Sequence, residues 1–480
     1  MVNHLFVRYT HLPKAVKASL WFTLCSILQK GISFMTIPIF TRMLSVEEYG
    51  VISLFGAWQS ILSIFATLNL SFQIFNNGMV KFEKDQAGYT TAMLGLSNFA
   101  TIILFIIYCI FHTQLDVVFD LPLEAIVLMF ISFLFSAATS LWTVQQRYLF
   151  EYRLLCQITL GLTFGSAVLG VFFVYFRETG IARIFANTIV EAIVGAGIYF
   201  LLLRKSKKLI HFSYWRYALK LDLPLIPHYL SMMVLGNSDR IMISDMCGKA
   251  ITALYSVPYN ASLVMWIIIT SINATFIPWT YQKCKTGEFK KIKESSSLLL
   301  MLVMVITLLP SLFAPELVWI LGADRYRESM WVVPPVSCSV FFVFVYSLFS
   351  NVELYYERSQ NIMIASLAAA AGNVILNYIC IPYFGYIAAA YTTLACYILL
   401  SVMHYCFMLN VCKDRKISEP IYNIRLIAFL SAFLVLYSVG VTFLFDKSWW
   451  IRYGVLALIL CGVIFKKEQI IRNFELIRKK

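Results

Sequence analysis

The sequence has few charged residues and lacks the short motifs that mark common enzyme sites. Asp, Glu, Lys and Arg make up 13% of its 480 residues, while hydrophobic residues make up 60%. So little polar surface cannot cover a water-soluble body of this length. No P-loop, GxSxG elbow, HExxH helix or DxD-like metal motif occurs in the sequence. These absences exclude a soluble globular fold and argue against an enzyme, and we expect neither a cofactor nor a metal.

Paired cysteines are lacking as well. The chain has 11 cysteines, an odd number, and none of them forms a CxxC pair. Most lie inside apolar stretches, as Cys25, Cys109 and Cys338 do. A buried free cysteine behaves as a small hydrophobic residue, so the sequence predicts neither a disulfide framework nor a thiolate metal site.

Long apolar stretches dominate the chain instead. About 20 mostly apolar residues cross a hydrocarbon core of roughly 30 Å, and fourteen stretches reach this length. The predicted fold class is therefore an all-α polytopic membrane protein with about 14 transmembrane helices. The spans are expected near residues 17–41, 50–76, 88–111, 121–143, 154–176, 181–203, 221–244, 251–279, 296–315, 329–350, 361–382, 386–410, 422–445 and 449–465.

Positive charge is distributed unevenly between the loops. Of the 39 Lys and Arg residues, 29 fall on the side that carries both chain ends and seven fall on the other side. Cytoplasmic loops collect Lys and Arg, so both termini are predicted to be cytoplasmic. The net charge of +14 is explained by this asymmetry and by attraction to anionic membrane lipids. Nucleic acid is not an expected partner, because no soluble domain offers a basic recognition surface.

A weak internal repeat divides the chain. When the sequence is shifted by about 206 positions, the motif beginning at Tyr49 meets the one beginning at Tyr255. Two lobes of six helices with the same orientation are predicted, an arrangement typical of secondary transporters with a substrate site between the lobes. The predicted domains are an N-terminal lobe at 1–204, a C-terminal lobe at 205–410, and two extra helices with a basic tail at 411–480.

Three runs of sequence carry a family resemblance. The runs LQKGISFMTIPIFTRMLSVEEYGVISLF (Leu28–Phe55), LPLIPHYLSMMVLGNSDRIMI (Leu223–Ile243) and GNVILNYICIPYFGYIAAAYTTLACY (Gly372–Tyr397) resemble Wzx-type polysaccharide or O-antigen flippases. Those proteins belong to the multidrug/oligosaccharidyl-lipid/polysaccharide (MOP) exporter superfamily. The likeness extends over essentially the whole chain, including the count of fourteen spans.

This resemblance implies a function and a set of partners. The expected activity is translocation of an undecaprenyl-diphosphate-linked oligosaccharide across the bacterial inner membrane, for O-antigen, capsule or exopolysaccharide synthesis. Alternating access driven by H+ or Na+ is the expected mechanism. A polysaccharide polymerase and a chain-length regulator are the expected protein partners.

Lys30 lies on a polar stripe of the first span. Ser26 and Ser33 share its helical face. An ionisable side chain inside a span costs about 2.5–3.5 kcal/mol, so it usually faces a wet cavity or a partner. We interpret Lys30 as a cavity cation that meets a diphosphate or an acidic sugar. Snorkelling, or a hydrogen bond between helices, is the structural alternative.

Three polar residues of the sixth span recur at every fourth position. Arg183, Asn187 and Glu191 therefore share one helical face. A guanidinium can bind phosphate oxygens through two hydrogen bonds, so Arg183 and Asn187 are candidates for the substrate cavity. Glu191 is a candidate for ion coupling. A purely structural network within the first lobe is the alternative.

Asn237, Asp239 and Arg240 lie together near the end of the seventh span. Asn237 and Arg240 fall on one helical face and are predicted to line the substrate cavity. Asp239 points elsewhere, so it need not neutralise Arg240, and it is the second candidate for ion coupling. The alternative is a polar cap of the helix near the membrane interface.

Four further residues are candidates for gates or loop anchors. Pro224 and Pro227 remove backbone donors, so they are predicted to bend or break the seventh span, as occurs where backbone lines a transporter cavity. Arg42 lies at the first turn on the periplasmic side, and Arg147 lies in the loop after the fourth span.

Two other functional classes are compatible with a polytopic chain. A polysaccharide polymerase or ligase would need a large periplasmic region, whereas the longest outward loop predicted here covers only residues 316–328. A cation-coupled multidrug exporter of the same superfamily would normally have twelve spans and acidic cavity residues. The two extra helices and the cationic Lys30 favour an anionic lipid-linked substrate.

Overall fold

The computed structural model describes residues 13–445, 450–454 and 457. This part of the chain is all-helical and has no strand. Twelve of its helical segments are long and apolar enough to cross a membrane. The chain is therefore a multi-pass α-helical membrane protein, as the sequence predicts. It separates into two compact units at residues 233 and 234, and helix α11 begins in the first unit and ends in the second.

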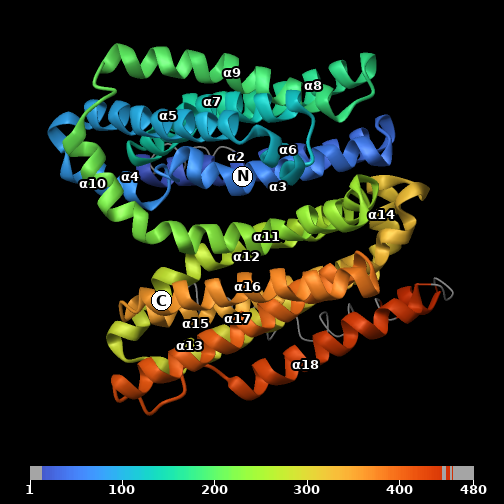
Figure 1. The fold of residues 1–480 in the computed structure, drawn as a ribbon. Coiled ribbons are helices and arrows are strands. Elements are labelled where there is room, and N and C mark those ends of the chain that lie inside the picture. The colour runs from blue at the N-terminus through green and yellow to red at the C-terminus, as the bar shows by residue number, and fades with distance from the viewer. Residues whose placement is uncertain (1–12, 446–449, 455–456, 458–480) are drawn as a thin grey trace, which may run out of the picture. The chain divides into compact units, whose positions relative to one another are not determined.

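Helices of the first unit lie alongside one another (Figure 1). Helix α7 packs on α5 and α9, α8 packs on α9, and α2 packs on α8. A short helix, α10, follows the last span of this unit and packs on α4 and α5. The elements are α2 (Lys14–Met43), α3 (Val46–Thr67), α4 (Gln73–Lys81), η1 (Glu83–Asp85), α5 (Gln86–Ile110), α6 (His112–Phe119), α7 (Leu123–Tyr148), α8 (Arg153–Phe176), α9 (Gly180–Lys205), α10 (Phe212–Asp222) and η2 (Leu223–Leu225).

Polar residues at the helix ends explain several boundaries in this unit. The hydroxyl oxygens of Ser45 and Thr179 accept hydrogen bonds from the first turns of α3 and α9, and the Asp85 carboxylate does so for α5. Such N-caps satisfy backbone donors that have no partner within the helix. The Glu48 carboxylate also accepts a hydrogen bond of 2.6 Å from the Gly180 N–H, which joins the start of α3 to the start of α9.

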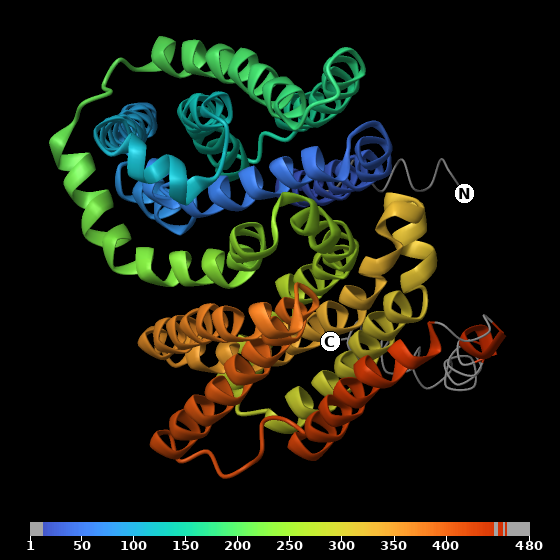
Figure 2. The same cartoon turned by 45° about the vertical axis from the view of Figure 1, so that its right-hand side comes forward.

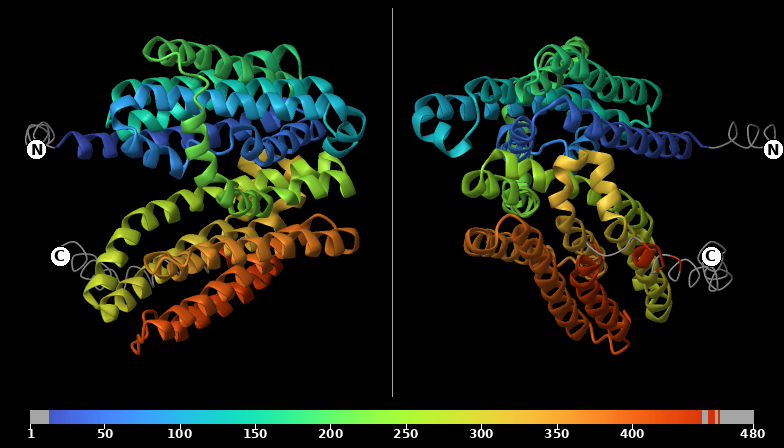
Figure 3. Two further views of the ribbon diagram at one scale, coloured as in Figure 1. Left: turned by 60° about the vertical axis from the view of Figure 1, so that its left-hand side comes forward. Right: turned by 90° about the vertical axis from the view of Figure 1, so that its right-hand side faces the viewer.

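The second unit is built around α15, which is buried on nearly every side. Helices α12, α13, α17 and α18 pack against α15, and α16 packs against α17. Figure 2 and Figure 3 show this bundle from further sides, with α16 and α17 in orange and α18 in red. The elements are α11 (Ile226–Cys247), α12 (Lys249–Thr286), α13 (Phe289–Leu312), α14 (Ala314–Gly322), η3 (Asp324–Val332), α15 (Val333–Tyr355), α16 (Ser359–Phe384), α17 (Ile387–Asp414), α18 (Ile424–Gly440) and η4 (Val441–Leu444).

Several predicted boundaries were wrong. The span expected at 50–76 ends at Thr67, because Leu68 and Asn69 adopt positive φ angles, and α4 is a separate helix. The span expected at 221–244 begins later, at Ile226, because Pro224 lies in the 3-10 turn η2. The loop expected at 316–328 is helical, formed by α14 and η3.

Two of the fourteen predicted spans are not among the twelve candidate segments. The seventh corresponds to α11, a 22-residue helix that contains polar residues such as His228, Asn237 and Asp239. The fourteenth, at 449–465, lies largely outside the described residues. The ten cysteines of the described part are all free.

Candidate functional site

The Arg183 side chain in the first unit is held by neutral groups. Its Nη1 donates hydrogen bonds to the Ser166 carbonyl at 2.7 Å and to Asn187 Oδ1 at 2.5 Å. The guanidinium carbon lies 4.3 Å from the centre of the Phe40 ring. No carboxylate of the described residues forms an ion pair with it, so the positive charge of Arg183 is not neutralised by a protein acid.

Glu191 lies two turns further along α9 and has a different partner. Its Oε2 accepts a hydrogen bond of 2.5 Å from the Ser132 hydroxyl on α7. Ser132 in turn accepts a hydrogen bond of 2.9 Å from the Gln59 amide on α3. The carboxylate of Glu191 therefore belongs to a polar chain across three helices and is separate from the Arg183–Asn187 pair.

Asp239 in the second unit is the most fully satisfied carboxylate of the candidate residues. Its side chain is buried and accepts hydrogen bonds from Tyr255 Oη at 2.5 Å, Asn377 Nδ2 at 2.7 Å and Thr393 Oγ1 at 2.7 Å. These donors come from α12, α16 and α17. Four helices therefore converge on one carboxyl group.

Further polar residues extend the Asp239 network. Asn377 also donates to Asn373 Oδ1 at 3.2 Å, and Asn373 donates to Thr393 at 3.1 Å. Ser238 donates to Asn373 at 2.8 Å, and Thr392 donates to Asn377. The Tyr255 and Thr393 hydroxyl oxygens lie beside the Asp239 carboxylate. Oxygen ligands of this kind suit hard cations, and the same carboxyl could instead carry a proton.

Arg240 follows Asp239 in the chain but points to other residues. Its Nη1 donates to the Gly236 carbonyl at 3.2 Å and to Asn237 Oδ1 at 3.1 Å. The guanidinium carbon lies 4.6 Å from the centre of the Tyr259 ring. Within the described part of the chain, Arg240 forms no ion pair, so it repeats the arrangement of Arg183: an arginine, an asparagine of the same helix and an aromatic ring.

Lys30 is exposed along α2, and it forms no hydrogen bond or ion pair with any described residue. The helix packs on α8 through Cys25 and Gln29, and the Gln29 amide donates to the Thr159 carbonyl at 3.1 Å. Lys30 and Ser33 of the polar stripe and the neighbouring Ile27 are exposed in the first unit, whereas Ser26 is partly buried. No described contact joins Lys30 to Arg183, whose guanidinium lies over Phe40 further along the same helix α2.

The four candidate gate residues occupy the ends of elements. Pro224 and Pro227 lie where α10 ends, the 3-10 turn η2 follows and α11 begins. The Arg42 guanidinium donates to the Pro38 carbonyl at 3.0 Å, at the C-terminal end of α2. Arg147 is exposed, and its guanidinium carbon lies 5.7 Å from the centre of the Phe22 ring.

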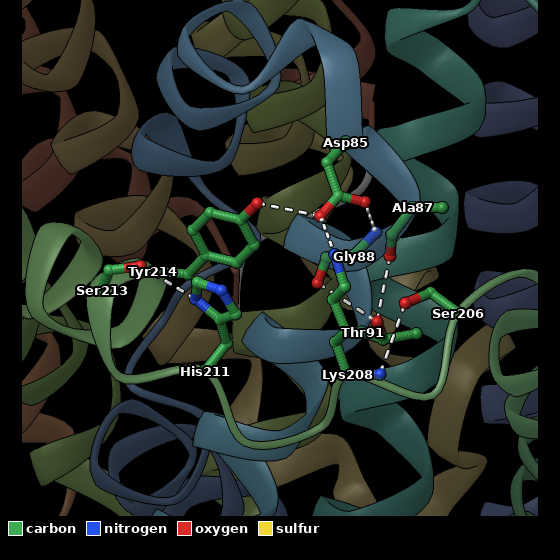
Figure 4. A network of polar contacts seen from close by, with 9 residues as sticks. All are labelled: Asp85, Ala87, Gly88, Thr91, Ser206, Lys208, His211, Ser213 and Tyr214. Carbon is green, nitrogen blue, oxygen red and sulfur yellow. Dashed lines mark hydrogen bonds and ion pairs between the residues drawn. The ribbon is translucent and has the colours of Figure 1, made fainter.

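A second polar network fixes α10 to the start of α5 (Figure 4). The Asp85 carboxylate accepts hydrogen bonds from Lys208 Nζ at 2.6 Å, Tyr214 Oη at 2.9 Å and the Gly88 N–H at 3.1 Å. Trp215 Nε1 donates to the Ala92 carbonyl at 2.8 Å. The hydrogen bond to Asp85 raises the pKa of Lys208.

Sequence reasoning missed all three hydrogen-bond donors of Asp239. Tyr255, Asn377 and Thr393 lie on three different helices, and no spacing within one helix brings them together. One signal was available: Asn373 and Asn377 are four residues apart on an otherwise apolar helix, so they share a face.

Comparison with known proteins places this architecture in a class. A lipid II flippase, MurJ, in an inward closed conformation superposes with a TM-score of 0.70 at 13% identity, covering 94% of this chain and 100% of that one. An inward-facing multidrug resistance transporter of the MATE family gives a TM-score of 0.61 at 13% identity, covering 84% and 100%. The fold is therefore that of the transporters of the MOP superfamily.

Sequence comparison gives the family. The family model described as polysaccharide biosynthesis protein matches residues 15–283. A protein of the Lsg locus of Haemophilus influenzae is 26% identical over 401 residues, covering 78% of this chain and 94% of the relative. The chain belongs to the polysaccharide biosynthesis protein family.

Proposed function

We propose that the chain is a flippase that moves an undecaprenyl-diphosphate-linked oligosaccharide across the bacterial inner membrane by alternating access. The product would serve O-antigen, capsule or exopolysaccharide synthesis, with a polymerase and a chain-length regulator as downstream partners. Both termini are proposed to be cytoplasmic, which the Lys and Arg asymmetry supports. The fold, the family and the chemistry of the two arginines all support this function.

The proposal rests on the groups that surround the guanidinium groups of Arg183 and Arg240. Each guanidinium is held by a carbonyl, an asparagine oxygen and a ring, and neither forms an ion pair among the described residues. A desolvated cation without a carboxylate partner is costly inside a membrane. A diphosphate would supply the missing negative charge through short, charge-assisted hydrogen bonds. Lys30 is proposed to add a third, exposed cation.

The coupling ion is proposed to bind at Asp239, with Glu191 as the second candidate. Asp239 is the stronger candidate because its carboxylate is buried among helices and has the hydroxyl oxygens of Tyr255 and Thr393 beside it. Sodium would replace the donated protons by direct coordination, whereas a proton would simply neutralise the carboxyl group. Either ion would shift the balance between two conformations that bind it unequally.

A reconstituted transport assay tests the proposed function. Proteoliposomes would carry the purified protein and a fluorescent polyprenyl-diphosphate oligosaccharide, and a membrane-impermeant quencher would report its leaflet. We expect Arg183→Gln and Arg240→Gln each to slow translocation at least about tenfold, since each removes a charge-assisted contact of about 1.5–3 kcal/mol. Arg177→Gln is the matched control, because Arg177 is exposed at the C-terminal end of α8.

The outcomes separate the candidate functions. Normal translocation by the correctly folded triple variant Lys30→Gln, Arg183→Gln, Arg240→Gln would disprove the cavity assignment. Uptake of a cationic drug, with no movement of the anionic lipid, would favour the multidrug exporter. Sodium-dependent thermal stabilisation that disappears in Asp239→Asn would identify the coupling ion as Na+.

A further inference from the structure

The carboxyl group of Asp222 is buried in the first unit without a hydrogen-bond partner. The residue is 1% exposed, and neither carboxylate oxygen has a partner. It ends α10, which lies outside the candidate membrane spans. Buried polar groups in proteins are nearly always hydrogen-bonded, so this carboxyl requires an explanation.

Asp222 lies on the face by which α10 packs on the rest of the unit. Tyr214, Ala218 and Asp222 recur at every fourth position and are the buried residues of this helix. Tyr214 is anchored through its hydroxyl to Asp85, and Ala218 is fully buried. Asp222 is therefore the acidic residue of this packing face, and its carboxyl group has no counterion among the described residues.

Two tyrosines lie near the Asp222 carboxyl. Tyr89 of α5 and Tyr229 of α11 lie close enough to the Asp222 carboxyl to interact with it electrostatically. The Tyr89 hydroxyl is itself buried without a hydrogen-bond partner, in space left by Gly78 of α4, where a Cβ would collide with it. Tyr217 of α10 lies near Tyr89.

The charged and titratable residues of the neighbouring elements make other contacts. Lys81 of α4 lies 4.1 Å above the Tyr217 ring, and Lys208 pairs with Asp85. On α11, the ring of His228 lies 5.9 Å from that of Tyr229. No described residue donates a hydrogen bond to the Asp222 carboxyl, so nothing offsets the cost of burying its charge.

An ionised carboxylate in this position would bear a large desolvation cost, with no hydrogen bond to offset it. The neutral acid avoids most of that cost, and burial raises the pKa of Asp222 to about 7. Asp222 is followed directly by η2, Pro224 and Pro227, which join α10 to α11. The protonation state of Asp222 therefore affects this joint.

We infer that Asp222 is a proton-binding site that holds α10 against α4 and α5 while it is neutral and releases α10 when it ionises. The proton leaves to water, and the carboxylate then gains hydration by moving out of the buried position. The site is distinct from Glu191 and Asp239, and it does not depend on the proposed substrate.

The pH dependence follows from linkage. Docked Asp222 has a pKa raised to about 7, whereas an undocked aspartate has a pKa of about 3.9. Between these values only the docked form keeps its proton, so docking weakens about tenfold per pH unit and levels off above the docked pKa. From about pH 5.5 to about pH 8.5 the docking equilibrium should fall about thirtyfold.

Hydrogen–deuterium exchange of the full-length protein in lipid nanodiscs tests this inference. Peptides that cover α10 would be followed at about pH 5.5 and about pH 8.5, with exchange times corrected for the intrinsic rate. The wild type should lose protection at the higher pH, whereas Asp222→Asn should keep it at both. Asp245→Asn is the matched control, because Asp245 is exposed, and it should behave like the wild type.

A second variant keeps the test decisive if Asp222→Asn folds poorly. Asp222→Glu retains a titratable carboxyl and should retain the loss of protection with rising pH. Equal α10 protection at both pH values in the wild type would overturn the inference. So would the same pH-dependent loss in a folded Asp222→Asn protein.

Discussion

The two units hold similar polar residues in different ways. In each unit an arginine binds an asparagine of its own helix and lies over a ring: Arg183 over Phe40, and Arg240 over Tyr259. The acids differ. Glu191 accepts one described hydrogen bond, whereas the buried Asp239 accepts three. The comparison suggests a shared role for the arginines and a specialised role for the second unit's acid.

Removing the Asp239 carboxyl group should lower the unfolding free energy more than any of the other substitutions. Asp239→Ala leaves the donors of Tyr255, Asn377 and Thr393 converging on empty space inside the bundle. Each unsatisfied buried donor costs about 1–3 kcal/mol, so we expect a loss of about 3 kcal/mol or more in unfolding free energy. Thermal unfolding in detergent, followed by tryptophan fluorescence, measures it. Asp239→Asn keeps an acceptor and should lose much less.

The corresponding substitution in the first unit, at Glu191, is the control for Asp239→Ala. Glu191→Ala removes one acceptor from Ser132, so it should cost only about 1 kcal/mol. Equal destabilisation by Asp239→Ala and Glu191→Ala would show that the two acids are equivalent, and the proposed specialisation of the second unit would fail.

A glycine tests the arginine of the first unit. A Cβ at Gly170 would lie 2.5 Å from Arg183 Nη1 and 2.9 Å from the Phe40 ring. Gly170→Ala should therefore displace the guanidinium from the Ser166 carbonyl. Gly161→Ala is the control, because a Cβ there meets no atom within 4 Å. We expect Gly170→Ala to be about 1 kcal/mol less stable than Gly161→Ala.

The transport assay then decides what that displacement means. If Arg183 binds the anionic substrate, Gly170→Ala should slow translocation while Gly161→Ala leaves it unchanged. A normal rate with displaced Arg183, seen as lost protection of α8 in hydrogen exchange, would assign Arg183 a structural role.

A conservative change at Glu191 should have a smaller effect. Glu191→Gln retains an oxygen for the Ser132 hydroxyl, so we expect a loss below about 1 kcal/mol in unfolding free energy. The charge alone is removed. A large loss of ion-driven transport with this small change in stability would move the coupling role from Asp239 toward Glu191.

The sequence predicted features that lie within one helix and missed those that need several helices. The spacing of Arg183 and Asn187 placed them on one face, and they are hydrogen-bonded. The break near Pro224 also follows from local backbone chemistry. The partners of Asp239 are separated from it by more than a hundred residues in two of three cases. Such a pairing depends on how α11, α16 and α17 pack, which one sequence does not reveal.

Asp222 was missed for a different reason. The apolar run around it placed it at the edge of a span, where a lone acid is unremarkable in sequence. Its burial depends on α10 packing on α4 and α5, and that packing is visible only in three dimensions. Tyr214, Ala218 and Asp222 are spaced four residues apart, which places them on one helical face. This spacing is informative only when α10 is recognised as a helix separate from α11.

The ion pairs in the loops of the two units should contribute least to stability. Their contributions should be lost at opposite ends of the pH range. In the second unit, hydrogen bonds from Lys291, Thr286 and Lys283 lower the pKa of Glu288 to about 2. This contribution to stability is present above the ordinary carboxyl pKa and is lost as the pH falls toward about 2. In the first unit, Asp85 raises the pKa of Lys208, so that contribution is lost only as the pH rises above the ordinary lysine range.

Salt and single variants separate these two contributions. Both pairs are partly exposed to solvent, so added salt should screen them. Glu288→Gln should remove only the acid-side loss of thermal stability, and Lys208→Gln only the alkaline-side loss. Because the Asp85 network also anchors Tyr214, Lys208→Gln should reduce α10 protection, whereas Glu288→Gln should leave α10 unchanged. Reduced α10 protection in both variants would mean that loop charge acts through the general electrostatic field rather than through these contacts.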